Sequence, residues 1–209
     1  DNDVAWVFWR SIGQDGAGTE VYGRRFDVRN RTCTAQSDEF RVNSDIVGNQ
    51  RDGVCCALPN GNVMAAWVSE KNNVNTLFGR LFDQQGQPLT EDFILHSNDE
   101  RGLNLVSLAP HPQGVLAAWA CTDLNGSPEG IQGSLISFDE QHNKSQELFL
   151  AHDGAASLAF EPSIDSANDG SFVVSWMSTL DGSQFDVTAR RFNNDLSPAA
   201  DEFIVPGAN

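Results

Sequence analysis

The chain has 209 residues, of which 40% are hydrophobic and 20% are charged, so it has enough apolar side chains to bury a core. Its 29 acidic residues against 13 basic ones give a formal net charge of −16, which disfavours nucleic acids and anionic membrane surfaces as partners. No apolar stretch reaches the roughly 20 residues of a membrane helix, so we expect no membrane insertion.

Three sequence features recur in the same order, roughly 55 residues apart, which indicates internal repeats. The first is an apolar run that ends in a tryptophan, at Trp9, Trp67, Trp119 and Trp176. The second is a strand that ends in a phenylalanine, at Phe26, Phe82, Phe138 and Phe192. The third is an acidic residue that opens an apolar strand, at Glu39, Asp92, Glu147 and Glu202. These features divide the chain into four repeats with approximate bounds 1–50, 51–103, 104–160 and 161–209.

In chain order, the first predicted strand covers residues 4–9, and it is followed by strands that end at Phe26 and begin at Glu39. The three later repeats each begin with an additional strand, predicted at Val54–Leu58, Leu105–Ala109 and Pro162–Asp165. Turns such as Asn60-Gly61 separate the strands, because glycine accepts the positive φ that tight turns require. No stretch keeps a 3.6-residue apolar period, so we expect almost no helix.

A four-stranded antiparallel unit repeated in tandem is typical of a β-propeller blade. We therefore predict an all-β, β-propeller-like fold of four tandem four-stranded blades, forming one repeat domain over residues 1–209. Neighbouring blades must stack, since each sheet alone would leave both of its faces in water. A β-sandwich or an elongated β-solenoid built from the same hairpins is the alternative.

The first blade is predicted to be incomplete, because only three residues precede the strand that ends in Trp9. Natural proteins seldom leave a sheet edge bare. We therefore expect the missing strand to come from outside this chain, either from a longer polypeptide or from a partner strand. A protein partner or self-assembly is the expected consequence.

The segment 169–205 resembles the tandem repeats of large bacterial secreted and surface proteins. Those repeats have a strand that ends in tryptophan, a Gln-Asp-Gly loop, an Arg-Phe-Asp strand and a Glu-Phe-x-Val strand, and residues 1–43 follow the same pattern. The second and third repeats depart from it, since 70–75 lacks the Asp-Gly loop and 134–138 lacks the arginine. The resemblance implies non-catalytic modules at an extracellular or cell-surface location, and it implies no particular ligand.

The sequence contains no HExxH, GxSxG, phosphate-loop or GxGxxG motif, and its four histidines are scattered. We therefore predict no catalytic residues and no enzyme. The favoured function is a structural, adhesion or protein-interaction module. A lectin that binds carbohydrate through loops on one face is the first alternative, and an enzyme with its site at the propeller axis is the second.

The repeated tryptophans and phenylalanines are interpreted as core residues, with sugar platforms as the alternative for the tryptophans. Trp6 has no counterpart in the other repeats, and it is the tryptophan most open to exposure. The recurring arginines Arg24, Arg80 and Arg190 are expected to pair with the acid that opens the next strand or with a neighbouring blade. Recognition of an anionic ligand is the alternative for them.

The acidic composition is compatible with calcium binding, and Asp15 and Asp181 in the Asp-Gly loops are the candidate ligands. No complete calcium-loop motif is present, and both residues are explained as turn residues, so we predict no metal site and no cofactor, with calcium as the alternative.

The N-glycosylation sequon occurs at Asn30, Asn125 and Asn143. The chain has four cysteines, Cys33, Cys55, Cys56 and Cys121. Their spacing is equally compatible with free thiols and with at least one disulfide.

Overall fold

The structure is a computed structural model that describes residues 3–14, 18–72, 74–97, 102–122, 128–153, 158–180 and 182–206. These residues form β-strands joined by turns, and their one helical element is a 3-10 turn at Arg29–Arg31. The chain divides into two compact parts, an N-terminal part, Asp1–Asp99, and a C-terminal part, Glu100–Asn209, each of which is described by itself. No helix in the described ranges is long and apolar enough to cross a membrane.

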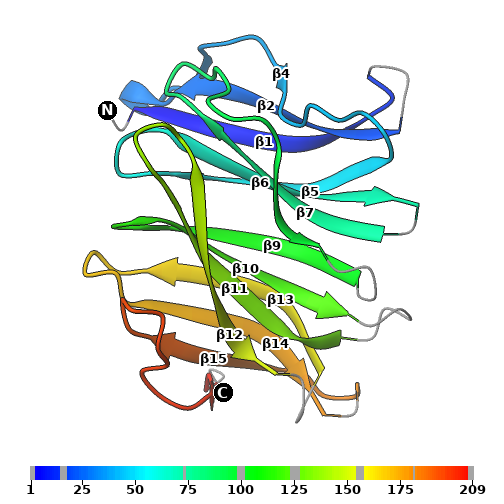
Figure 1. Cartoon of the computed structure of the whole chain (residues 1–209), viewed down its shortest axis with the longest axis vertical. Coiled ribbons are helices and arrows are strands. Elements are labelled where there is room, and N and C mark those ends of the chain that lie inside the picture. The colour runs from blue at the N-terminus through cyan, green and yellow to red at the C-terminus, as the bar shows by residue number, and fades with distance from the viewer. Residues whose placement is uncertain are drawn as a thin grey trace. The chain divides into compact units, whose positions relative to one another are not determined.

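The N-terminal part contains two groups of strands (Figure 1). The first group is an antiparallel hairpin with two short pieces paired to its second strand, and its members are β1 (Val4–Ile12), β2 (Thr19–Asp27), β3 (Thr34–Ala35) and β4 (Phe40–Arg41). The second group is a four-stranded antiparallel sheet of β5 (Asn49–Ala57), β6 (Val63–Lys71), β7 (Val74–Phe82) and β8 (Phe93–Ser97). One parallel bridge between Thr19 and Asn49 joins the two groups.

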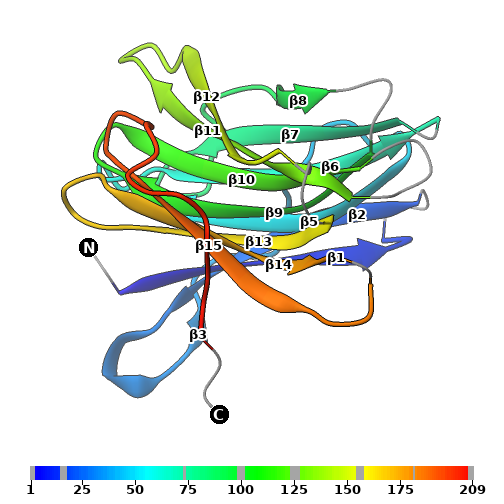
Figure 2. The same cartoon turned by 90° about the horizontal axis from the view of Figure 1, so that it is seen from below.

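The C-terminal part contains two four-stranded antiparallel sheets. The first consists of β9 (Gly102–His111), β10 (Gly114–Thr122), β11 (Pro128–Phe138) and β12 (Lys144–His152). The last sheet consists of β13 (Leu158–Ser166), β14 (Phe172–Thr179), β15 (Asp186–Phe192) and β16 (Phe203–Ile204). In both sheets the strands pair in chain order, and β13, β14 and β15 lie side by side in both views (Figures 1 and 2).

The all-β prediction is confirmed. The strands expected at Leu105–Ala109 and Pro162–Asp165 lie within β9 and β13, and the one expected at Val54–Leu58 overlaps β5, which ends one residue earlier, at Ala57. The first group has no such strand in the described residues and begins with β1, which carries Trp9. Its last strand differs from the expectation, because β2 pairs with two short pieces instead of one continuous strand. Within each part, consecutive antiparallel strands therefore follow the pattern that the repeats predicted.

Three of the four repeated tryptophans belong to the core, since Trp67, Trp119 and Trp176 are each 1% exposed. Trp9 is only half-buried, which corrects the expectation for this residue. The reason lies in strand alternation: the face of β1 that carries Trp6 and Phe8 packs against Trp67 in the N-terminal core. Trp9 lies on the opposite face, next to Val7, which is 47% exposed.

The repeated phenylalanines divide in the same way. Phe82 and Phe192 are 1% exposed, whereas Phe26 and Phe138 are half-buried. Phe192 stacks on Phe172 with ring centroids 4.8 Å apart, in the core cluster that also holds Trp176. The periodic aromatic pattern thus identified real strand positions, but burial depends on whether another sheet covers the face concerned.

The strand register reveals a repeated pair that the sequence features did not include. A small residue of the third strand lies opposite a phenylalanine of the fourth, and the pairs are Gly23–Phe40, Gly79–Phe93, Gly133–Phe149 and Ala189–Phe203. In the third repeat this register places Leu148, not Glu147, at the position of the acidic residue that opens the strand. The prediction for Glu147 was therefore shifted by one residue, because the aromatic ring over the glycine sets the register.

Candidate functional site

The first strands of the sheets share an irregularity at the same place. The pairing of β5 with β6 shifts between Arg51 and Val54, and the pairing of β13 with β14 shifts between Phe160 and Ser163. In β9 the shift lies beside Trp119. Such bulges disrupt the ladder locally, turn a side chain in a new direction, and occur frequently next to active sites.

Two of these bulges carry an acidic residue in the left-handed backbone conformation. Asp52 in β5 has φ of 57°, and Glu161 at the equivalent position of β13 has φ of 48°. Residues other than glycine rarely adopt this conformation, and a side chain as long as glutamate adopts it less readily than aspartate. A conformation of this kind persists only where the surrounding structure requires it, and it is concentrated at functional sites.

Both carboxylates are accessible to solvent, each within its own part of the chain. The side chain of Asp52 is 29% exposed, and it forms an ion pair with Nη1 of Arg51. Glu161 is exposed, and no hydrogen bond or ion pair engages it within the described residues. These side chains are therefore candidates for acid–base chemistry that the sequence motifs did not identify, because an acidic residue in an acidic chain carries no signal by itself.

A pocket of about 590 Å³ lies in the N-terminal part, and we call it the Trp6–Arg25 pocket. Its walls come from β1, β2, the hairpin between β5 and β6, and the loop after β7. The side chains on which its chemistry depends are Trp6, Arg25, Gln36, Asn60, Gln84 and Gln85. An indole, a guanidinium and several planar amides are groups that recognise polar ring-shaped ligands.

A second, smaller pocket of about 270 Å³ lies in the C-terminal part, between β12 and the last sheet. Its His152 side chain is 3% exposed, with Nδ1 at 3.1 Å from each carboxylate oxygen of Glu202. The His152 ring lies 5.5 Å from the ring of Trp176, centroid to centroid. The His152–Glu202 pair links β12 to the residue that precedes β16.

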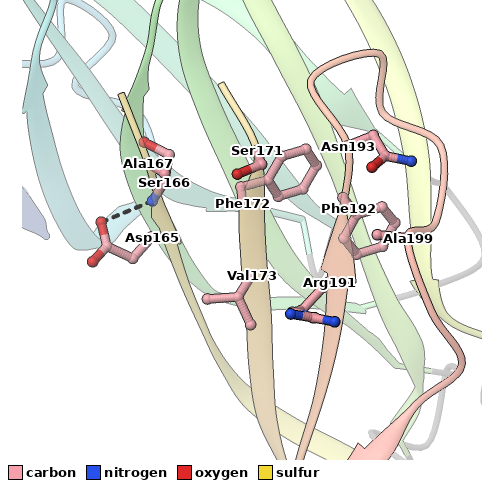
Figure 3. A pocket seen from close by; sticks show the side chains of 10 residues that line it. All are labelled: Asp165, Ser166, Ala167, Ser171, Phe172, Val173, Arg191, Phe192, Asn193 and Ala199. Carbon is pink, nitrogen blue, oxygen red and sulfur yellow. Dashed lines mark hydrogen bonds between the residues drawn. The ribbon is translucent and has the colours of Figure 1, made fainter. Parts of the chain in front are cut away.

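A third pocket of about 470 Å³ lies on the last sheet (Figure 3). Asp165, Val173 and Arg191 form a row across β13, β14 and β15, because they are direct cross-strand neighbours. The equivalent face of the preceding sheet carries Leu116, which is fully buried in the core cluster. The pocket is therefore a partly apolar sheet face with two charged side chains at its sides.

Of the three recurring arginines, Arg80 pairs with the acid that opens the next strand, as expected, whereas Arg24 and Arg190 bond backbone carbonyls. Arg80 pairs with Asp92 at 3.6 Å, donates from Nε to the carbonyl of Thr90 at 3.1 Å, and donates from Nη1 to the carbonyl of Val42 at 3.2 Å. Arg24 and Arg190 make the equivalent Nε bonds, to the carbonyls of Ser37 at 2.9 Å and Ala200 at 3.4 Å. These guanidiniums hold the loop before the last strand.

The remaining predicted site residues are less informative. Asp15, Asp181 and Asn125 lie outside the described residues. Asn30 and Asn143 are exposed on turns between the third and last strands, and Nδ2 of Asn143 donates to the carboxylate of Asp139 at 2.8 Å. No group of three or more histidine, cysteine or acidic side chains within the described ranges has the arrangement of a metal site.

The four cysteines are thiols, with Cys33 exposed and Cys56 and Cys121 buried. Burial raises the pKa of Cys55 to about 11. Burial, together with the neighbouring Cys55, raises the pKa of Cys56 to about 12. Thiols with such pKa values are weak nucleophiles at neutral pH, so Cys55 and Cys56 fit a structural role.

No protein-family model and no curated protein sequence matches the chain. Solved structures match it in fold. An α-L-arabinanase of Penicillium chrysogenum complexed with arabinobiose aligns with 95% of this chain and 65% of its own, at 10% identity and a TM-score of 0.60. The GH93 α-L-arabinofuranosidase of Fusarium graminearum with arabinobiose aligns with 97% of this chain and 66% of its own, at 9% identity and a TM-score of 0.53.

An endo-arabinase from Bacteroides thetaiotaomicron aligns with 96% of this chain and 79% of its own, at 10% identity and a TM-score of 0.52. The chain thus spans about two thirds of the length of the first two solved structures. At these identities the likeness shows the fold.

The comparisons correct the predicted function. The sequence favoured a non-catalytic structural, adhesion or protein-interaction module and no enzyme, but the three solved structures described above are enzymes: an arabinanase, an endo-arabinase and an arabinofuranosidase. The reason for the error is physical: the repeated features report strand packing, and a repeated fold carries no information on the chemistry of a site. Carboxylates on separate strands also form no linear motif, so the absence of catalytic motifs did not argue against an enzyme.

Proposed function

We propose that this chain belongs to a β-propeller glycoside hydrolase that acts on arabinose-containing polysaccharides outside the cell. The observation that carries the proposal is the acidic residue at the same bulge of two first strands, Asp52 in β5 and Glu161 in β13. The fold likeness to two arabinan-degrading enzymes and an arabinofuranosidase supports the class of substrate.

The proposed architecture treats the sheets as successive blades, the first of which is incomplete. In such an arrangement the first strand of each blade lies nearest the propeller axis, where ligands bind. The register supports this, since β5, β9 and β13 all carry their irregularity beside the buried tryptophan of the next strand.

Glycoside hydrolysis requires carboxyl groups that protonate the leaving oxygen and activate a water molecule or attack the sugar. Asp52 and Glu161 are the candidates for these roles, each to be tested singly. The ion pair with Arg51 orients the carboxylate of Asp52. Glu161 is exposed and available to a substrate oxygen.

An extracellular location follows from the proposed substrate, because polysaccharides are degraded outside the cell. The resemblance of 169–205 to repeats of secreted bacterial proteins supports it, and so does the strongly acidic composition with two lysines. The proposed partner is therefore a glycan. A protein partner that completes the first blade remains a separate prediction.

The test is hydrolysis of linear arabinan and arabinobiose by the purified protein, measured as released reducing sugar. We expect Asp52→Asn and Glu161→Gln each to lower the rate by roughly a hundred-fold or more while the melting temperature stays within a few degrees. Asp165→Asn is the matched control, because Asp165 is an exposed acid on the same strand as Glu161. Full activity of both variants, or no sugar release by the unmodified protein, would overturn the proposal.

A further inference from the structure

We propose that the Trp6–Arg25 pocket is a separate binding site for an acidic sugar, in which Arg25 pairs with the carboxylate of a uronic acid. The pocket is lined by residues of the N-terminal part alone. It contains neither Asp52 nor Glu161, so the proposal goes beyond hydrolysis and stands or fails independently of it.

The guanidinium of Arg25 has hydrogen-bonding capacity that the protein leaves unused. Nη1 donates to the carbonyl of Gln84 at 2.6 Å, but Nε is buried and has no hydrogen-bond partner among the described residues. Arg25 also makes no ion pair within the described ranges, although Arg29, Arg51 and Arg80 all do.

A guanidinium without an ion-pair partner favours a ligand with two oxygens that can accept parallel hydrogen bonds. Arginine presents two parallel N–H groups that match the two oxygens of a carboxylate, and these bonds are stronger than those between neutral groups.

The remaining lining favours a sugar as the bearer of that carboxylate. Trp6 is the direct cross-strand neighbour of Arg25, and its ring is held by edge-on contacts with Phe8 and Phe40 at 6.3 and 5.9 Å between centroids. An immobilised indole at a pocket wall offers an apolar surface to the C–H face of a sugar ring. The amide side chains that can exchange hydrogen bonds with sugar hydroxyls are Gln36, Asn60, Gln84 and Gln85.

The same cross-strand position in the other sheets shows that this pair is not required by packing. Met64–Leu81 in the second repeat and Leu116–Leu135 in the third are apolar and buried. The fourth repeat has Val173 opposite Arg191 in the row that also contains Asp165. Only the first repeat combines a tryptophan with an arginine that lacks an acidic neighbour, among the residues that the structure describes.

The experiment is calorimetric titration of the purified protein with three probes: digalacturonic acid, arabinobiose and inorganic phosphate. We expect digalacturonic acid to bind in a manner that weakens with added salt, and arabinobiose and phosphate to bind at least roughly ten-fold more weakly at this pocket. Arg25→Gln and Trp6→Phe should each weaken binding of digalacturonic acid by roughly ten-fold or more, and Arg25→Lys should weaken it less.

Arg191→Gln is the matched control, since Arg191 has the same register position in the last sheet, and it should leave the affinity unchanged. Melting temperatures of all variants separate loss of binding from loss of folding. If Arg25→Gln destabilises the folded protein, Arg25→Lys provides a second test, because it keeps the positive charge. Digalacturonic acid binding that survives Arg25→Gln, or no binding of digalacturonic acid, would overturn the proposal. Arabinan hydrolysis by Arg25→Gln should equal that of the unmodified protein, so the two proposals fail separately.

Discussion

The ring of Phe93 occupies the space that a side chain on Gly79 would need. A Cβ atom built on Gly79 would come within 2.6 Å of Cε2 of Phe93, closer than two carbon atoms pack. The same relationship holds for Gly133 and Phe149, at 2.3 Å from the Cζ atom. The glycine is therefore part of the register between the third and fourth strands, because it admits the aromatic ring that fixes their alignment.

Gly79→Ala should destabilise the protein by about 1–3 kcal/mol, because the added methyl group forces the Phe93 ring out of its site. Chemical denaturation measures the change. Ala189→Gly is the matched control, since Ala189 already has a Cβ opposite Phe203, and it should cost less than about 1 kcal/mol through backbone entropy alone. Equal effects of the two substitutions would show that the ring does not depend on the glycine.

Trp119→Ala should lower the free energy of unfolding by about 3–5 kcal/mol, because it empties a fully buried aromatic site. Trp9→Ala should cost roughly 1–2 kcal/mol, since Trp9 is half-buried and part of its surface already contacts water. Urea denaturation of both variants gives the comparison. A cost for Trp9 as large as that for Trp119 would mean that the face of β1 that carries Trp9 is covered in the folded protein.

Arg80→Lys should destabilise the protein by about 1–3 kcal/mol, although the charge is kept. Lysine does not reproduce the three directions in which Arg80 bonds, to the carbonyls of Val42 and Thr90 and to the carboxylate of Asp92. Thermal unfolding is the measurement. Arg29→Lys serves as the control: the Arg29 side chain is 59% exposed, and no measurable change is expected from its ion pair with Asp27.

His111 should make stability depend on pH. Burial is the main cause that lowers the pKa of His111, although its hydrogen bond to the carbonyl of Gly170 acts in the opposite direction. Nδ1 accepts a hydrogen bond from the backbone N–H of Gln113 at 3.2 Å, so the folded state requires the neutral ring with its proton on Nε2. Because the folded pKa lies below the unfolded value, the contribution is complete above about pH 6.5 and is lost as the pH falls through the folded pKa.

The measurement is the urea midpoint between about pH 7.5 and pH 5. The unmodified protein should lose stability over this interval, and His111→Asn should show a smaller loss. A pH profile that is identical in the His111 variant would contradict the assignment.

The strands and their order were accessible from the sequence, because they depend on local patterns. Apolar runs that end in Trp67, Trp119 and Trp176, with glycine-containing turns between them, specify short strands wherever they occur. The partners of Arg80 could also be anticipated, since an arginine and an acid at fixed repeat positions come from neighbouring strands of one sheet. The register at Phe149 was missed by one residue, because the ring contact with Gly133 that sets it is not a feature of either strand alone.

Tertiary structure decided the burial of each face and the location of each site. Trp9 has the same sequence context as Trp67, yet it is half-buried, because burial depends on a second sheet and not on the strand itself. Asp52 and Glu161 adopt left-handed conformations at bulges, where β5 and β13 have extra residues relative to the strands with which they pair. No pattern within one strand encodes these conformations. Trp6 and Arg25 become neighbours only when β1 pairs with β2 and loops from a second sheet close the pocket, since side chains distant in sequence meet only in the folded chain.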